Sequence, residues 1–184
     1  DALKGADILS TAPDKYTSSV EYSTTAIGQY MKNIAQTHLA GFGTRVLYTT
    51  SPYNGFDTHA NQAVGQSNLL KDVAGNVDSF MSDLRQLNVS DNVVMLLYSE
   101  FGRRAIDNGS GTDHGSGGGA FLIGDKIKSG MYSQYPSLKP EDQLDGDLQF
   151  NYDFRGFYSS VLEQHMGLDP TEIVGGTFEQ LKFI

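Results

Sequence analysis

The stretch that most constrains the fold is SDNVVMLLYSE, residues 90–100. An uninterrupted apolar run follows a turn signal and ends at a serine and a glutamate. A strand that is apolar on both faces must be covered on both, as is typical of a central strand in a parallel sheet. We therefore predict a buried strand over 92–99, with helices packed on both faces of its sheet.

Helical and strand-like segments alternate around this run. Apolar residues recur at helical spacing in three segments, which we expect to be helices: 18–39, 62–87 and 153–166. Short β-branched or apolar runs predict two further strands: 44–50 and 120–124. Pro52 and Asn54 predict a turn after the first of these. This alternation predicts an α/β fold, in three α/β/α layers with a mostly parallel sheet.

Two further segments lack helical periodicity. We expect residues 1–17 to form a loosely ordered lead-in and residues 101–119 to form a glycine-rich loop. The opening DALKGADILS has neither an initiator methionine nor a signal-peptide pattern, so we expect a processed or cut piece of a longer protein. At 184 residues without an apparent repeat or linker, the chain suits one domain, 1–184.

Charge and composition exclude several kinds of partner. With 13 basic and 22 acidic residues the net charge is −9, so the chain lacks the basic field that holds nucleic acid phosphates. No apolar stretch approaches the roughly 18 residues needed to span a bilayer. The absence of cysteine removes disulfides, thiolate metal ligands and a cysteine nucleophile together.

Residues suited to chemistry gather in two loops that follow predicted strands. The strand at 44–50 leads into NGFDTHANQ, and the strand at 92–99 leads into the glycine-rich loop. Ligands of open α/β sheets bind beyond the carboxyl ends of the strands, so we expect the two loops to meet there. They carry carboxylates and imidazoles that suit zinc, manganese or a similar divalent ion: Asp57, His59, Glu100, Asp113 and His114.

Each of these residues also has a simpler interpretation. Asp57 precedes a predicted helix and could be its N-cap or form an Asx-turn. A lone loop histidine is more often a surface residue than a ligand. Glu100, at the end of an apolar strand, should be paired or coordinated, and its alternative is a salt bridge to Arg103 or Arg104.

Four motifs in this order resemble a bacterial family, the domain of unknown function fifteen-oh-one. They are GFDTHANQ, YSEFGRR, NGSGTDHGSGGGAFLIG and YDFRGFYSSVLEQHMGLD, and the resemblance runs from about residue 27 to 168. The family is similar to a branch of the alkaline phosphatase and sulfatase superfamily, which uses two metal ions to move phosphoryl or sulfuryl groups. Its members are often exported through the twin-arginine pathway, which implies a periplasmic or secreted protein.

The resemblance also assigns roles to residues. In the superfamily an Asp, a His and a later His hold one metal, and these match Asp57, His59 and His114, although the usual first spacing is Asp-x-x-x-His. Glu100 matches the acid of the second metal site, but Phe101 stands where a His often follows. The superfamily nucleophile lies in an early segment that the chain begins too late to include, so we expect the C-terminal part of the fold.

Two functional hypotheses follow from these features. The first is a metal-dependent hydrolase of phosphate or sulfate esters in which Arg103 clamps an anionic oxygen. The simpler alternative is that Arg103 is only the counter-ion of Glu100. The second is a non-catalytic exported domain that binds a cell-surface glycan or protein through its glycine-rich loop. A third possibility is that Asp57, His59 and His114 have a purely structural role.

Overall fold

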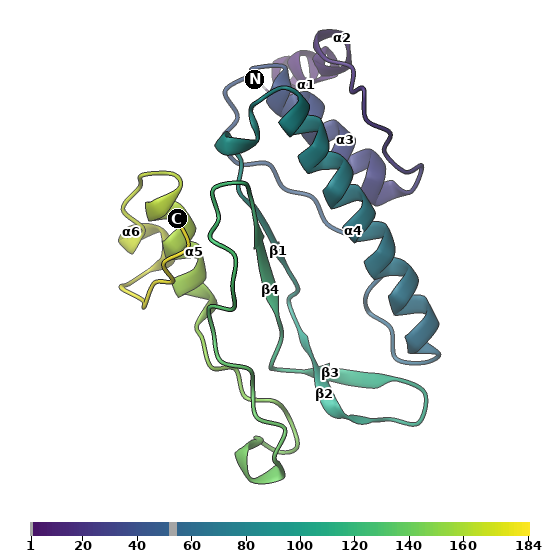
Figure 1. Cartoon of the computed structure of the whole chain (residues 1–184), viewed down its shortest axis with the longest axis vertical. Helices are drawn as coiled ribbons and strands as arrows, with labels where there is room; N and C mark the ends of the chain where they lie inside the picture. Colours follow the sequence, from purple (N-terminus) through teal and green to yellow (C-terminus); the bar gives the residue numbers. More distant parts are fainter. Residues whose placement is uncertain (1, 52–54) are drawn as a thin grey trace. The chain divides into compact units, whose positions relative to one another are not determined.

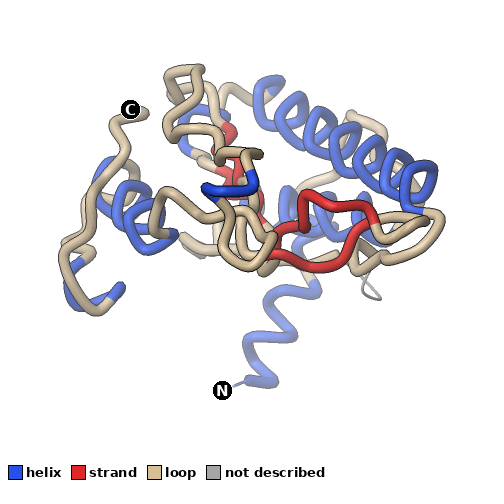
Figure 2. The backbone as a smooth tube through the Cα atoms, turned by 90° about the horizontal axis from the view of Figure 1, so that it is seen from below, coloured by secondary structure: helices blue, strands red, loops and turns tan. Residues whose placement is uncertain are grey.

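A computed structural model of the chain describes residues 2–51 and 55–184 (Figures 1 and 2). The chain divides into two compact units, Asp1–Ser90 and Asp91–Ile184, and each is described by itself. The turn predicted at Pro52 and Asn54 lies outside the described residues. No helix in the described part of the chain has both the length and the apolar character needed to cross a membrane.

The described part of the first unit is helical. Its elements are α1 (Ala2–Ser10), α2 (Ala12–Lys15), α3 (Ala26–Leu39) and α4 (Gln62–Gln86), with the short 3-10 turn η2 (Ser90–Asn92) at the unit boundary. Helix α3 packs along α4 (Figure 1). The predicted helix over 18–39 begins only at Ala26, because Thr25 caps it by accepting the Gly28 N–H. The buried apolar residues of this unit are Ala12, Tyr22, Met31, Ala35, Phe80, Met81 and Leu84.

A buried carboxylate ties the N-terminal segment to α4. Asp83 is fully buried and accepts hydrogen bonds from the hydroxyls of Tyr16, at 2.5 Å, and Tyr22, at 3.0 Å. Burial, with Asp83 beside the ring hydroxyl, raises the pKa of Tyr16 to about 12 and that of Tyr22 further still. The prediction of a loosely ordered lead-in over 1–17 is therefore wrong, since this segment is helical and its last tyrosine is anchored.

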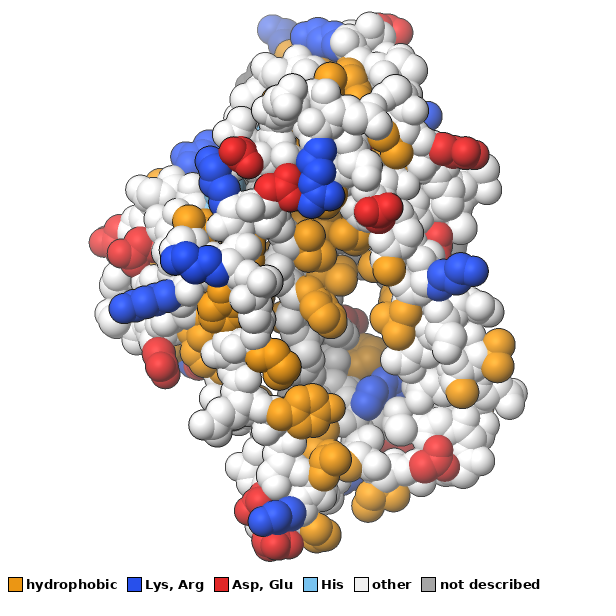
Figure 3. All heavy atoms as spheres, in the orientation of Figure 1, with side chains coloured by type: hydrophobic (Ala, Val, Ile, Leu, Met, Phe, Trp, Pro, Cys, Tyr) orange, Lys and Arg blue, Asp and Glu red, His pale blue; other side chains and the backbone are white. Residues whose placement is uncertain are grey.

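The second unit contains two small antiparallel sheets. Strand β1 (Met95–Tyr98) pairs with β4 (Ala120–Ile123), and β2 (Gly102–Asp107) pairs with β3 (Thr112–Gly115). The turn η3 (Pro140–Asp142), α5 (Phe154–Gln164) and α6 (Thr171–Val174) follow. Phe183 is buried here and packs edge-on against Phe157 and Tyr132. Hydrophobic side chains nevertheless reach the surface in several places on the face that Figure 3 shows.

Helix α5 begins where the sequence predicts it to begin. The Asp153 side chain accepts the backbone N–H of Arg155 at 2.8 Å, which is an N-cap interaction. The Arg155 guanidinium also forms an ion pair with this carboxylate at 2.7 Å. Together these donors hold the pKa of Asp153 below its ordinary value.

The mixed α/β composition is confirmed, but the predicted sheet is not observed. The strands expected at 92–99 and 120–124 are present as β1 and β4, yet they pair with each other and run antiparallel. Every strand pairing among the described residues is antiparallel. The apolar run of β1 therefore does not reflect parallel neighbours on both sides, and its residues are only half-buried or exposed.

Two local predictions are wrong. Residues 44–50 form no strand, and Val46 and Tyr48 are 69% and 73% exposed. β-propensity reflects packing on a pleated surface, and the described part of the first unit contains no strand with which this segment could pair. Residues 101–119 are not one loop, because they contain the β2–β3 hairpin.

Candidate metal centre

Asp57 and His59 lie side by side in the loop that precedes α4. Asp57 Oδ1 and His59 Nε2 are 3.2 Å apart, and the two side chains are 40% and 48% exposed. Two ligands bound to one zinc ion at tetrahedral angles, with bonds of about 2.0–2.1 Å, would lie about 3.3–3.4 Å apart. The observed separation therefore suits either a direct hydrogen bond or a shared metal ion.

The N-cap interpretation of Asp57 is wrong. The N-cap of α4 is Asn61, whose backbone is left-handed at φ 50° and ψ 36° and whose side chain makes no capping hydrogen bond. The loop is instead held by Gln62, which is buried and donates from Nε2 to the carbonyl and hydroxyl oxygens of Thr58, at 2.8 and 3.0 Å. Sequence reasoning missed Gln62, because a helical glutamine carries no local signal of this role.

His114 lies on β3 in the second unit. Its ring stacks on Phe101, with ring centroids 3.7 Å apart and planes 11° from parallel. The Arg103 guanidinium lies 5.1 Å from the centre of the same aromatic ring, and Arg103 is opposite His114 in the β2–β3 register. The Phe101 ring thus fixes the plane of the His114 imidazole.

The alternative interpretation of Glu100, a salt bridge to Arg103 or Arg104, is not observed among the described residues. Glu100 is exposed and makes no ion pair with any residue that the structure describes. Arg103 instead donates from Nη1 to the Thr112 carbonyl at 2.8 Å, and Arg104 donates from Nη2 to the Asp145 carbonyl at 2.5 Å. Both arginines therefore brace the hairpin and the turn beside it.

Asp113 takes part in the hairpin's own hydrogen bonds. Its Oδ1 accepts from Asn108 Nδ2 at 2.9 Å, and the Asn108 N–H donates to the Gly111 carbonyl at 2.9 Å. These bonds close the turn between β2 and β3. The structure thus gives Asp113 a local structural contact in addition to the metal-binding role predicted for it.

The glycines after β3 allow close packing. A Cβ on Gly115 would overlap the Asp147 carboxylate, and one on Gly117 would lie 2.7 Å from Leu148 Cβ. Asp147 Oδ2 accepts the Ser116 N–H at 2.9 Å, while its buried Oδ1 has no hydrogen-bond partner among the described residues. The glycine-rich segment is therefore a packed strand end, and Asp147 is a second residue that sequence reasoning missed.

The chemistry of the predicted ligands is consistent with a metal site. Asp57, His59 and His114 are all exposed, and each carries a side chain that can ligate a metal ion. One carboxylate and two imidazoles are a donor set that zinc and manganese accept, with a coordination position left for water or substrate.

Comparison with known proteins identifies a family. The family model described as "Protein of unknown function (DUF1501)" matches residues 9–181 of the 184-residue chain. Neither the curated proteins nor the solved structures contain a match. The match extends the resemblance found over residues 27–168 toward both ends. The chain therefore belongs to the DUF1501 family of proteins of unknown function.

Proposed function

We propose that the chain belongs to a metal-dependent hydrolase of phosphate or sulfate esters, in which Asp57, His59 and His114 bind one divalent ion, zinc or manganese. The observation that carries the proposal is the 3.2 Å separation of Asp57 Oδ1 and His59 Nε2 in an exposed loop. In the same proposal the protein has the C-terminal part of an alkaline-phosphatase-like, three-layer fold and works in the periplasm or outside the cell.

Charge supports a cation at this site. The chain carries a net charge of −9, which repels an anionic ester unless local positive charge offsets it. When bound, a divalent ion supplies Lewis acidity to an ester oxygen and a lower pKa to water. The residues of the chain hold that ion, and Arg103 donates N–H groups to an anionic oxygen of the ester. Glu100 and Asp113 are the candidate ligands of a second ion.

Elemental analysis and calorimetric titration with zinc and manganese test the metal site. We expect about one ion per chain for the wild type. Each of His59→Ala and His114→Ala should weaken binding at least about tenfold, since a ligand is lost outright. The matched control is His38→Ala, which removes a histidine of α3 that is not in the proposed site. Unchanged stoichiometry and affinity in the double variant His59→Ala/His114→Ala would overturn the proposal.

Ester turnover is measured on the metal-loaded protein with a chromogenic phosphate ester and a chromogenic sulfate ester. Hydrolysis that is lost in His59→Ala and retained in His38→Ala supports the hydrolase. Metal binding without turnover of either ester contradicts catalysis by this chain and favours the second function.

The second function is a non-catalytic exported domain that binds a cell-surface glycan or protein. Phe101 favours it, because an aromatic ring stacked on His114 occupies the position where the superfamily often has a metal-binding histidine. The residues exposed on the β2–β3 hairpin would then form the contact surface. Binding of surface polysaccharide that persists after metal removal would distinguish this function from the first.

A further inference from the structure

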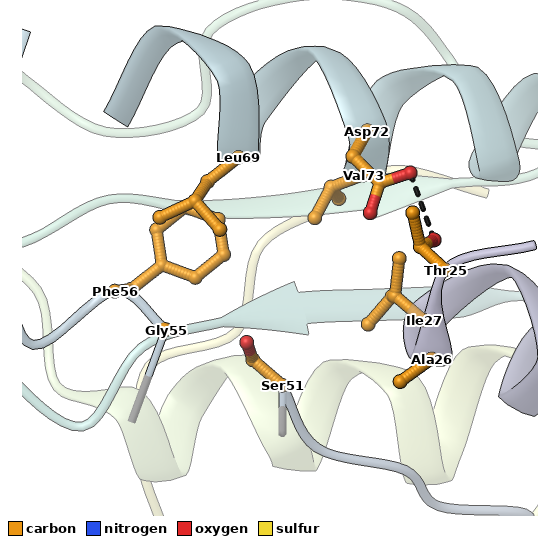
Figure 4. A pocket seen from close by; sticks show the side chains of 9 residues that line it. All are labelled: Thr25, Ala26, Ile27, Ser51, Gly55, Phe56, Leu69, Asp72 and Val73. Atoms are coloured by element: carbon orange, nitrogen blue, oxygen red, sulfur yellow. Dashed lines mark hydrogen bonds between the residues drawn. The ribbon is translucent and has the colours of Figure 1, made fainter. Parts of the chain in front are cut away.

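The carboxylate beside the small pocket between α3 and α4 has a structural role (Figure 4). Asp72 of α4 accepts a hydrogen bond from the hydroxyl of Thr25, the N-cap residue of α3, at 3.0 Å. Asn76, one turn later on α4, donates to the same oxygen at 2.9 Å. These bonds hold the start of α3 against α4. A different set of polar contacts lies in the second unit, at the turn between β2 and β3.

Asn108 and Gly109 lie in this turn, and both are exposed (Figure 1). An asparagine that precedes a glycine is chemically vulnerable, because the backbone nitrogen of the glycine can attack the side-chain amide carbon without hindrance from a side chain. Gly109 has a φ of 99°, and nothing lies within 4 Å of the position where a Cβ would stand. The backbone beside the attacking nitrogen is therefore uncovered on that side.

Three hydrogen bonds act on the atoms that this attack would involve. The Gly109 N–H donates to Asp107 Oδ1 at 2.6 Å, which is within the reach of a base that removes its proton. The Ser110 N–H donates to Asn108 Oδ1 at 3.2 Å, and this oxygen gains negative charge when the amide carbon is attacked. The leaving nitrogen, Asn108 Nδ2, donates to Asp113 Oδ1 at 2.9 Å. The nucleophile, the developing oxyanion and the leaving group thus each have a partner.

We infer that Asn108 is a site of self-catalysed deamidation, with Asp107 as the base. Asp107 takes the proton of the Gly109 N–H while the nitrogen bonds to Asn108 Cγ and closes a succinimide ring. The bond between Cγ and Nδ2 breaks, and Nδ2 takes up a proton and leaves as ammonia. Water then adds to either carbonyl of the ring and opens it. The products are aspartate and isoaspartate at position 108.

The conversion changes the charge and the backbone of the hairpin turn. A carboxylate at position 108 faces Asp113 in place of the amide that donated to it, and like charges repel. Isoaspartate also adds a methylene group to the backbone of the turn, which the bond from the Asn108 N–H to the Gly111 carbonyl closes. The same hairpin holds Arg103 opposite His114. Deamidation therefore loosens the strand pair that carries a proposed metal ligand.

The test is peptide mapping by mass spectrometry of the whole chain, incubated at neutral pH after removal of metal with EDTA. We expect conversion at position 108 to be faster than at exposed Asn88, which the β-branched Val89 follows. The Asp107→Asn variant keeps an oxygen that can accept the Gly109 N–H but lacks the base. Conversion should be at least about tenfold slower in this variant, because a positioned base typically contributes about 10²–10⁴-fold. Fragment spectra separate position 108 from Asn54, which also precedes a glycine.

Asp78→Asn is the matched control, since it makes the same substitution at an exposed carboxylate of α4. It should convert at position 108 as fast as the wild type, and circular dichroism should show that both variants are folded. In concentrated urea, the wild type and Asp107→Asn should convert at similar rates, because the contacts of the turn are lost.

Equal rates for the folded wild type and folded Asp107→Asn overturn the inference. It is also overturned if Asp107→Asn is slowed as much in urea as in the folded state, or if the folded wild type shows no conversion at position 108. Metal is absent throughout, so these outcomes are separate from the fate of the proposed hydrolase.

Discussion

At the residue scale, the polar groups that matter most for stability are those buried with distant partners. Asp83 accepts from Tyr16 and Tyr22, which are 67 and 61 residues away in the sequence. No local pattern around Asp83 predicts this, because its helical position is equally typical of an exposed acid. By contrast, the helix over 153–166 was predicted close to its observed bounds, because the helical spacing of its apolar residues is a local feature.

Replacement of Asp83 by Asn should destabilise the protein by about 1–3 kcal/mol at pH 7, since two tyrosine hydroxyls lose a charged acceptor. The variant should also change the alkaline pH dependence of stability. Tyr16 has a folded-state pKa of about 12, above its ordinary value of 10.0. Its contribution is therefore fully present below pH 10 and is lost as the pH rises from 10 to about 12. Urea unfolding between pH 7 and pH 12 measures both effects.

Asp78→Asn again serves as the control, because its carboxylate is exposed and should change stability by no more than about 0.5 kcal/mol. A wild-type protein whose stability did not fall between pH 10 and pH 12 would contradict the buried tyrosine–carboxylate cluster. So would an Asp83→Asn variant as stable as the Asp78→Asn control.

At the scale of elements, sequence patterns predicted which helices and strands are present better than they predicted which strands pair. The stripe of apolar residues that ends in Phe80, Met81 and Leu84 predicts α4. The prediction succeeds because every residue of the stripe lies within one helix. The direction of β1 depends on β4, which begins more than twenty residues later, and nothing in the apolar run encodes that choice. The strand expected over 44–50 was wrong for the same reason, since a strand requires a partner.

Gly115→Ala should destabilise the β2–β3 hairpin by about 1–3 kcal/mol, because its Cβ would overlap the Asp147 carboxylate and lie 2.7 Å from the Arg103 carbonyl carbon. Gly119→Ala is a closely matched control, because nothing lies within 4 Å of its Cβ. Chemical denaturation, with hydrogen exchange of the β2 and β3 amides, compares the two variants. Equal stabilities would show that the Asp147 carboxylate does not pack against the strand.

At the scale of the whole molecule, the proposed metal ligands come from both units of the chain. Asp57, His59 and His114 were identified from their sequence context. Gln62 and Asp147, which hold the loop before α4 and the end of β3 in place, were not. Candidate ligands could be named from the sequence because metal chemistry limits ligands to a few side chains. The supporting residues could not, because their role depends on packing.

Metal should protect amides in both units if all three ligands bind one ion. With zinc at a hundred times its dissociation constant, we expect a stabilisation of about 2.7 kcal/mol. Slower hydrogen exchange should appear both near residues 57–59 and along β3. Protection confined to the first unit would show that His114 is not a ligand. At the same zinc concentration, the His59→Ala variant should be stabilised by about 1.4 kcal/mol or less, because its affinity is at least about tenfold weaker.

The exposed segment 44–50 has a consequence for how the protein behaves in concentrated solution. Its β-branched and aromatic residues carry little charge, include no proline and form no strand ladder in the described structure. Such a segment is a template for edge-to-edge assembly with identical chains. Arg45 is the single charged residue in this segment, and its charge opposes such assembly. We therefore expect replacement of Arg45 by a neutral residue to lower the solubility of the protein.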